Sequence, residues 1–227
     1  MQCSWCQKEI IRNLTLKEIL WPFLIKERRC ENCQQRLTVI KQPCCSTCCK
    51  PGLQDPCEDC LKWKERYPTY DFCHQALFDY DEAFKEWIHQ YKFRGDYRLR
   101  STFVPEIKNF FKGKEEDIIC CIPVSKKRFE QRGLNQVEAI FVAANIKTVP
   151  LLSKIDDKDE IPQSQKNKIE RLKTPQTFFA TKWASEIKDK KVWIVDDVYT
   201  TGRTMFYAAQ ALISYNPKQI RTFSLAR

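Results

Sequence analysis

Two adjacent acids near the end of the chain, Asp196 and Asp197, directly follow an apolar run at residues 192–195. The uncharged, largely β-branched character of that run predicts a strand covered on both faces, as in the centre of a parallel α/β sheet. Ligands of such sheets bind at the carboxyl ends of the strands. Two neighbouring carboxylates at that position can each accept a hydrogen bond from one of the two adjacent hydroxyls of a ribose.

The residues that follow the acids form a Thr/Gly turn, which consists of Thr200, Thr201, Gly202, Arg203 and Thr204. Because residues 205–215 are expected to form a helix, the turn lies at a helix N-terminus, where free N–H groups and the helix dipole favour a phosphate dianion. Gly202 is one of only five glycines and lets the backbone approach the anion closely. A simple threonine cap would need neither acid, so the pattern favours a polyol- and phosphate-binding loop.

Cysteines concentrate at the other end of the chain, where four pairs share the C-x-x-C spacing: Cys3/Cys6, Cys30/Cys33, Cys45/Cys48 and Cys57/Cys60. This spacing places two sulfurs on one side of a tight turn, and two such turns complete a tetrahedral Zn²⁺ shell. The start of the chain has no secretory signal pattern, so the 13 cysteines are expected in a reducing compartment that favours metal over disulfides. Pairing neighbours predicts two structural four-cysteine zinc sites.

The spacing leaves other zinc arrangements open. Interleaved pairing of the four turns would also fill two metal shells. The third group contains Cys44 and Cys49 beside Cys45 and Cys48, so the ligands could be shifted by one residue. Cys45 and Cys48 are preferred because they keep two intervening residues between turn-like flanks. Closed four-thiolate sites have no open position, which predicts a structural role for both.

A group of cations follows the next expected strand, residues 117–123, and is expected to form a loop after a central strand. Its candidate ligands are Ser125, Lys126, Lys127 and Arg132. Such a loop suits a pyrophosphate, which needs neutralising donors as it binds and leaves. A solvated face or a contact with nucleic acid is the alternative for the lysines.

Together these motifs resemble the ComF family of competence proteins, which carry a type I phosphoribosyltransferase domain. Residues 194–204 resemble the motif that binds phosphoribosyl pyrophosphate (PRPP), and residues 92–96 resemble the Lys-x-x-Gly-Asp turn of the family. Residues 123–136 resemble its Pro-x-Pro loop followed by Arg-Gly-Phe-Asn-Gln. The chain departs from the family at four positions, with Cys49 for glycine, Ser125 for proline, Leu134 for phenylalanine and Thr174 for asparagine.

The resemblance implies an α/β fold, with a type I phosphoribosyltransferase-like parallel sheet of about five strands flanked by helices and a small N-terminal Cys-rich zinc module. We expect the zinc module in residues 1–68 and the phosphoribosyltransferase-like domain in residues 69–227, since cysteine density falls near Pro68. Further expected elements are helices at 14–25, 82–93 (capped by Asp81), 99–111 and 133–144, and strands at 72–80, 149–152, 178–180 and 220–226. His74 and His89 are expected at or near the surface.

The resemblance also implies site roles. Asp196 and Asp197 would be the catalytic pair that orients the ribose, and residues 200–204 would hold the 5′-phosphate. Lys126, Lys127 and Arg132 would stabilise the departing pyrophosphate, which would hold Mg²⁺ together with the ribose hydroxyls. A mobile loop over residues 153–174, with Gln163 and Arg171, would close over the ligand and exclude water.

By the same resemblance, the chain acts as an accessory protein of DNA uptake in natural transformation, with single-stranded DNA and the competence helicase/translocase as partners and PRPP or a nucleotide as ligand. The alternative is an active phosphoribosyltransferase on an unidentified base or nucleotide fragment. Trp63, Tyr67 and Tyr70 could stack on DNA bases or pack between domains. No acceptor-base pocket can be assigned from the sequence.

Composition agrees with a DNA-binding role. The formal net charge of +10 falls to about +6 when eight thiolates and two zinc ions are included. No apolar stretch approaches the roughly 20 residues that a membrane span requires. We therefore expect a cytoplasmic protein, with any membrane contact peripheral at the uptake machinery.

Overall fold

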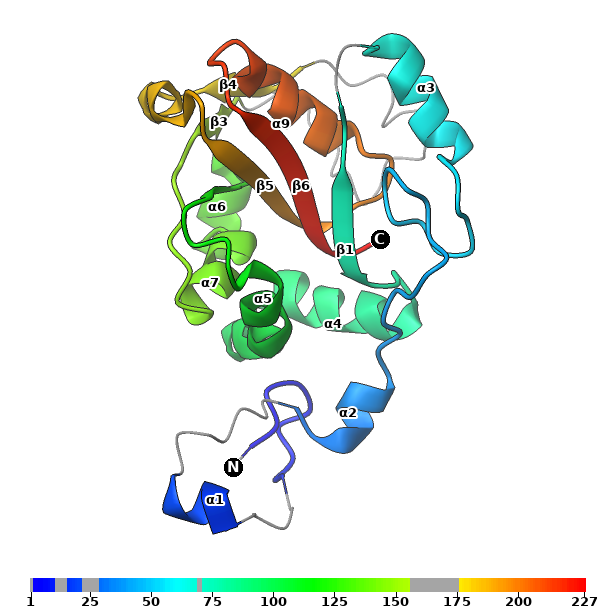
Figure 1. The fold of residues 1–227 in the computed structure, drawn as a ribbon. Coiled ribbons are helices and arrows are strands. Elements are labelled where there is room, and N and C mark those ends of the chain that lie inside the picture. Colours follow the sequence, from blue (N-terminus) through cyan, green and yellow to red (C-terminus); the bar gives the residue numbers. More distant parts are fainter. Residues whose placement is uncertain (1, 11–15, 22–28, 69–70, 156–175) are drawn as a thin grey trace.

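The computed structural model describes residues 2–10, 16–21, 29–68, 71–155 and 176–227. A parallel four-stranded sheet forms its centre, with the order β1-β6-β5-β2 (Figure 1). Its strands are β1 (His74–Phe78), β2 (Ile118–Cys121), β5 (Lys191–Val198) and β6 (Gln219–Ala226). The carboxyl ends of all four strands therefore point the same way, as the sequence predicted.

The apolar run at the start of β5 is buried on both faces of the sheet. Trp193 and Val195 face one core, and Val192 and Ile194 face the other. The first core lies under the helices α4 (Glu82–Phe93), α5 (Val104–Phe111) and α7 (Gln136–Ala143). The second lies under α9 (Arg203–Ile213) and the antiparallel pair β3 (Leu152–Lys154) and β4 (Phe178–Ala180). The sheet is thus flanked by helices on both faces (Figure 1).

Side-chain caps fix the helices that approach the sheet edge. Asp81 accepts a hydrogen bond from the Phe84 backbone N–H at 2.9 Å, so α4 begins where the sequence predicted. Asn135 accepts from the Val137 N–H at 3.0 Å and starts α7. These caps satisfy backbone donors that the first turn of a helix leaves without partners.

Residues 125–136 differ most from the expectation of a loop. They contain a helix, α6 (Lys126–Arg132), which Gly133 ends in the left-handed conformation at φ 73°. The seven residues of α6 include no proline or glycine that would prevent a helix. The preceding strand, β2, lies at an edge of the sheet and not in its centre.

Other expected elements are divided or displaced. Residues 99–111 form the 3₁₀ helix η2 (Tyr97–Ser101) and then α5, because Pro105 is tolerated only in the first turn of a new helix. Val149 donates one hydrogen bond to the Ile119 carbonyl, but β3 pairs with β4 outside the sheet. The described residues thus form four parallel strands where about five were expected. A further 3₁₀ helix, η3 (Lys182–Ile187), precedes β5.

His74 is completely buried, whereas a surface or half-buried position was expected. Its two ring nitrogens lie 2.9 Å from Thr222 Oγ1 and 3.0 Å from Ser224 Oγ, both on β6. Burial, together with the charge of Arg227, lowers its pKa well below the usual value, so the ring is neutral. A sequence pattern cannot distinguish this core histidine from a surface one.

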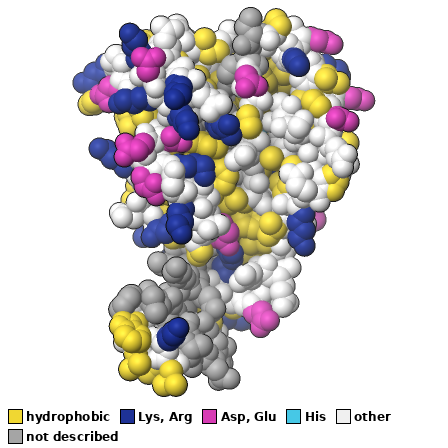
Figure 2. All heavy atoms as spheres, viewed as in Figure 1, with side chains coloured by type: hydrophobic (Ala, Val, Ile, Leu, Met, Phe, Trp, Pro, Cys, Tyr) yellow, Lys and Arg dark blue, Asp and Glu magenta, His cyan; other side chains and the backbone are white. Residues whose placement is uncertain are grey.

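The N-terminal segment carries α1 (Leu16–Leu20), α2 (Glu31–Gln35) and α3 (Glu58–Arg66). Of the helix expected at residues 14–25, only α1 and Trp21 lie within the described residues. Figure 2 shows hydrophobic side chains gathered at the lower end of the view, in the N-terminal segment. In α1 of this segment Leu16, Ile19 and Leu20 are more than half exposed. None of the helices in the described part of the chain is long and apolar enough to cross a membrane.

Candidate functional site

A cleft of about 300 Å³ opens at the carboxyl ends of β5 and β2. It lies between the end of α4, the inner side of α6, the strand β3 and the loop that joins β5 to α9. Its charged and hydroxyl-bearing lining residues include Lys92, Arg128, Arg132, Lys154, Asp196, Asp197, Thr200 and Thr204. This is the position in which parallel α/β sheets bind ligands.

The two acids lie side by side in this cleft. Asp197 forms an ion pair with Lys92, whose Nζ is 2.5 Å from Asp197 Oδ2, and its backbone N–H donates to Asp196 Oδ1 at 2.9 Å. Burial and the neighbouring charge of Asp197 raise the pKa of Asp196 to about 7, while Lys92 opposes the shift. Asp196 therefore changes its charge near neutral pH.

Four cations line the same cleft as the acid pair: Lys92, Arg128, Arg132 and Lys154. The Arg132 guanidinium lies 5.6 Å from the Phe93 ring centroid and donates to Gln136 Oε1 at 3.3 Å. Burial and the adjacent Arg128 lower the pKa of Arg132, although the group remains a cation at neutral pH. This excess of positive charge suits a ligand with several negative charges.

The helical form of residues 126–132 divides the predicted cation group. Arg128 and Arg132 line the cleft, whereas Lys126 and Lys127 are exposed on the outer side of α6. Ser125 is buried at the N-terminus of the helix. A helical period of three to four residues would have separated the two sets, but a loop was expected there.

Three cleft cations were absent from the predicted site. Lys92 belongs to the Lys-x-x-Gly-Asp turn, and Arg128 is adjacent to the predicted lysines, so both carried a sequence signal. Lys154 lies in a three-residue strand within a polar segment and carried none. The predicted loop residues Gln163 and Arg171 lie outside the described residues.

The Thr/Gly turn, residues 200–204, is called the phosphate loop below. Thr200 and Thr204 line the cleft, and α9 begins at Arg203 directly after the left-handed Gly202 (φ 79°). Thr201 is buried. The side chain of Arg203, the first residue of α9, donates to Tyr207 Oη one turn later at 3.0 Å. The loop therefore offers the hydroxyls of Thr200 and Thr204 and a helix N-terminus to the cleft, while the Arg203 side chain packs against α9.

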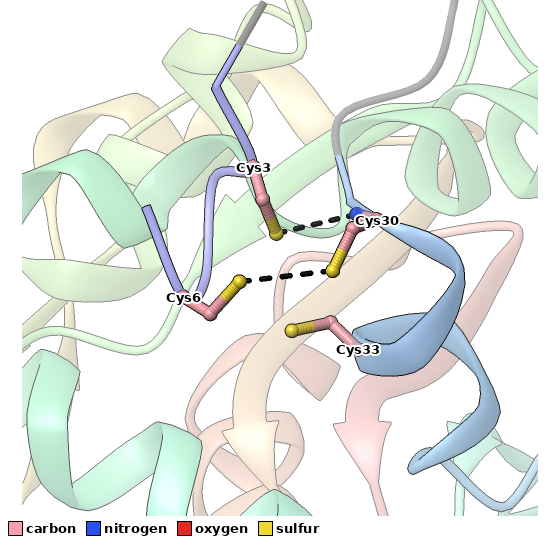
Figure 3. A group of neighbouring side chains, drawn as sticks. All are labelled: Cys3, Cys6, Cys30 and Cys33. Atoms are coloured by element: carbon pink, nitrogen blue, oxygen red, sulfur yellow. Dashed lines mark hydrogen bonds between the residues drawn. The ribbon is translucent and has the colours of Figure 1, made fainter. Parts of the chain in front are cut away.

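The eight predicted metal ligands form two separate groups, Cys3/Cys6/Cys30/Cys33 and Cys45/Cys48/Cys57/Cys60. Within each group all sulfurs lie within 4.8 Å of one another. Figure 3 shows the first group, in which sulfurs from the N-terminal turn and from the start of α2 converge. The Cys30 N–H donates to Cys3 Sγ at 3.3 Å, and the Cys57 N–H makes the same contact with Cys45 Sγ. The structure brings neighbouring pairs together and not interleaved ones, in agreement with the preferred arrangement.

The same geometry settles the register of the second group. Cys44 and Cys49 lie outside it, and Cys49 Sγ donates to the His74 carbonyl at 3.3 Å. Cys49 has a φ of 57°, which explains why the family usually has a glycine there. Four converging thiols without a fifth ligand fit a structural Zn²⁺ site.

Comparisons with known proteins agree with this fold and site. Residues 112–227 match the family model described as phosphoribosyl transferase domain. Over its whole length the chain is 33% identical to competence protein ComFC of Streptococcus pneumoniae, covering 100% of both chains. It is 28% identical to competence protein ComFC of Bacillus subtilis, over 99% of this chain and 94% of the relative.

A solved structure of Trypanosoma cruzi hypoxanthine phosphoribosyl transferase is also similar, with 15% identity, coverage of 59% of this chain and 66% of that one, and a TM-score of 0.32. That score is too low to support an argument. The family match and the relatives define a protein with a phosphoribosyltransferase domain. The chain belongs to the ComF family of competence proteins, as a ComFC-like member.

Proposed function

We propose that the cleft binds PRPP or a nucleotide together with Mg²⁺, and that the chain uses this site while it handles incoming single-stranded DNA in natural transformation. The observation that carries the proposal is the position of the Asp196/Asp197 pair, which shares one cleft with the phosphate loop and four cations. A ribose with phosphates at both ends needs these three kinds of group in one cleft.

Each part of the cleft has a defined task in this proposal. Asp196 and Asp197 accept hydrogen bonds from the ribose hydroxyls, and the N–H groups of the phosphate loop bind the 5′-phosphate. Arg128, Arg132 and Lys154 neutralise the pyrophosphate. The carboxylates suit Mg²⁺, which would be shared with phosphate oxygens and water and would neutralise part of the ligand charge.

The outer side of α6 supports the DNA part of the proposal. Phe129 is 51% exposed on this helix, which also carries the exposed basic residues Lys126 and Lys127, and the 57% exposed Phe93 lies at the cleft. Exposed aromatic rings beside cations can stack on bases and pair with phosphates.

The aromatic residues first considered for stacking are less suited. Trp63 is buried against α9, and the half-buried Tyr67 packs on it with ring centroids 5.9 Å apart. Tyr70 lies outside the described residues. Trp63 and Tyr67 therefore serve packing, and we propose the outer side of α6, with its exposed Phe129, as a stacking surface.

The partner that we propose is the competence helicase/translocase, because the relatives are competence proteins and single-stranded DNA is what such a motor delivers. The place of action would be the cytoplasmic side of the uptake machinery. A pull-down between the purified chain and the translocase, with and without single-stranded DNA, tests this contact directly.

An active phosphoribosyltransferase is the second candidate. It is favoured by the raised pKa of Asp196, about 7, which lets this carboxyl exchange a proton at neutral pH. Pyrophosphate release from PRPP in the presence of a pool of bases would support it. Release that is no faster than with PRPP alone would leave ligand binding as the function of the cleft.

A complementation assay tests the whole proposal. A transformable strain that lacks its own ComFC receives this chain, its Asp196→Asn/Asp197→Asn variant, or a Glu186→Gln control with a change in an exposed acid of η3. We expect the chain and the control to restore transformation and the double variant to fail at equal protein level. Full transformation activity of the double variant would show that DNA uptake does not need the ligand site of the cleft.

A further inference from the structure

The second cysteine group, Cys45/Cys48/Cys57/Cys60, is connected to the phosphate loop by two independent sets of contacts. We propose that this group sets the position of the loop, with Trp63 as the positioning residue, and thereby determines how tightly the cleft binds its phosphate ligand. The proposal rests on the proposed function only for the nature of the ligand.

The first connection runs through α3. This helix begins directly after Cys57 and contains Cys60, so the second cysteine group fixes its first turn. One turn later, the buried Trp63 donates from Nε1 to the Thr201 carbonyl at 2.8 Å. A backbone carbonyl of the phosphate loop is therefore held by a side chain whose helix is anchored on the cysteine group.

Ring stacking strengthens this connection. Trp63 stacks on Phe206 with ring centroids 4.4 Å apart, and Phe72 stacks on Phe206 at 3.9 Å. Phe206 lies in the first turn of α9, and its N–H donates to the Gly202 carbonyl at 2.9 Å. The start of α9 is thus fixed from the side of α3 as well as from the sheet.

The second connection runs through Arg227 and Tyr199. Arg227 donates to Cys48 Sγ at 3.4 Å, and its guanidinium lies 4.8 Å from the Tyr199 ring centroid. Tyr199 in turn packs so closely against Gly202 that a Cβ on this glycine would lie 2.2 Å from Tyr199 Oη. Two successive residues of the phosphate loop are therefore connected to the cysteine group, Thr201 through Trp63 on α3 and Gly202 through Tyr199 and Arg227.

The first cysteine group has a different environment. Cys3 and Cys33 pack in the core on the opposite face of the sheet, together with Phe78 and Trp87. Figure 1 shows this N-terminal segment beyond α4, whereas α3 lies on the side of α9. The two groups therefore have separate roles, and only the second supports the phosphate loop.

Positioning of this kind affects affinity because a loop that is already in its binding conformation loses less freedom when the ligand arrives. Trp63→Phe tests the idea, since it keeps an aromatic ring on Phe206 but removes the donor to Thr201. Tyr67→Phe is the matched control at the C-terminal cap of the same helix, where the lost hydroxyl contacts Gln210 and not the loop.

The first measurement is hydrogen exchange of the unliganded protein by mass spectrometry, with zinc content measured in parallel. In Trp63→Phe we expect two zinc ions per chain, as in the wild type, and faster exchange over residues 200–204. The second is calorimetry with PRPP and Mg²⁺, where we expect affinity to fall about tenfold, as for a buried carbonyl left without its donor.

Exchange and affinity equal to those of Tyr67→Phe would overturn the proposal. Arg227→Gln, which breaks the second connection, should change exchange in the same direction and serves if Trp63→Phe does not fold by circular dichroism. A wild-type chain that binds no PRPP would refute the ligand assignment alone, because the exchange measurement still decides whether the second cysteine group holds the loop.

Discussion

At the scale of single residues, the charge of Asp196 depends on its burial and on the neighbouring charges of Asp197 and Lys92. Burial and the charge of Asp197 raise the pKa of Asp196, and the cation of Lys92 partly opposes them, so that the net value is about 7. An acid with a raised pKa is protonated below that value and ionised above it, so binding that needs both carboxylates strengthens as pH rises through about 7. The ligand site is therefore expected to be pH-sensitive.

Lys92→Met should move this pH dependence upward. Without the cation, Asp196 keeps its proton to higher pH, and the midpoint of PRPP affinity against pH should rise above the wild-type value. Calorimetry at several pH values measures it. Lys85→Met, at an exposed position of the same helix, is the control for loss of a lysine. Asp196→Asn removes the titrating carboxyl, so any pH dependence that remains in this variant comes from other groups such as the ligand phosphates. An unshifted midpoint in Lys92→Met would contradict the role of the ion pair.

Gly202 is required for two physical reasons, its φ of 79° and its contact with Tyr199. Gly113 has a similar φ of 77° but open space around it, so Gly113→Ala measures backbone strain alone, about 1 kcal/mol. Gly202→Ala should lose about 1–3 kcal/mol more because Tyr199 must move. Urea unfolding measures both changes, and equal losses would show that the Tyr199 contact is unimportant.

At the scale of elements, the sequence predicted the helices, strands and turns that are determined by residues close together in the chain. The apolar run of β5, the Asp81 cap of α4 and the C-x-x-C turns each depend on residues that are close in the chain. The pairing of β3 with β4, the burial of His74 and the contact of Trp63 with Thr201 depend on residues far apart in sequence. No local pattern encodes such contacts, so the structure was needed for them.

The helix α6 shows how one element changes the assignment of a site. As a loop, residues 125–132 were expected to offer Lys126, Lys127 and Arg132 to one ligand. As a helix, they present Arg128 and Arg132 to the cleft and Lys126 and Lys127 to the outside. The two sides of α6 are therefore expected to bind different ligands.

Paired variants test this division. Lys126→Gln/Lys127→Gln should weaken single-stranded DNA binding and reduce the slope of log affinity against log salt by about 1.4, since each phosphate contact contributes about 0.7. PRPP affinity should stay unchanged. Arg128→Gln/Arg132→Gln should chiefly weaken PRPP binding. Fluorescence anisotropy and calorimetry measure the two ligands, and equal losses of both in each variant would reject the division.

At the scale of the whole molecule, the two cysteine groups support different parts of the fold. The second group shares a core with β5 and α9. The expected boundary near residue 68 therefore marks the end of the cysteine-rich sequence, but residues on both sides of it pack in the same core. The division into residues 1–68 and 69–227 stays a prediction. Limited proteolysis that releases a stable C-terminal fragment would support it.

Metal content gives the corresponding test. Elemental analysis should find two zinc ions per chain, and one in either Cys33→Ser or Cys57→Ser. Because Cys57 belongs to the core beneath α9, its loss should lower the unfolding temperature of the phosphoribosyltransferase domain more than the loss of Cys33. Equal destabilisation by the two variants would show that the second group is no more closely connected to the domain than the first.

The central claim is that Asp196 and Asp197 form the ribose side of a PRPP or nucleotide site. Isothermal calorimetry with PRPP and Mg²⁺ tests it most directly, in the wild-type chain, in Asp196→Asn/Asp197→Asn and in the control Glu186→Gln. We expect saturable binding in the wild type and the control, and none in the double variant. Unchanged heats in the double variant, or no heat in the wild type, would contradict the account.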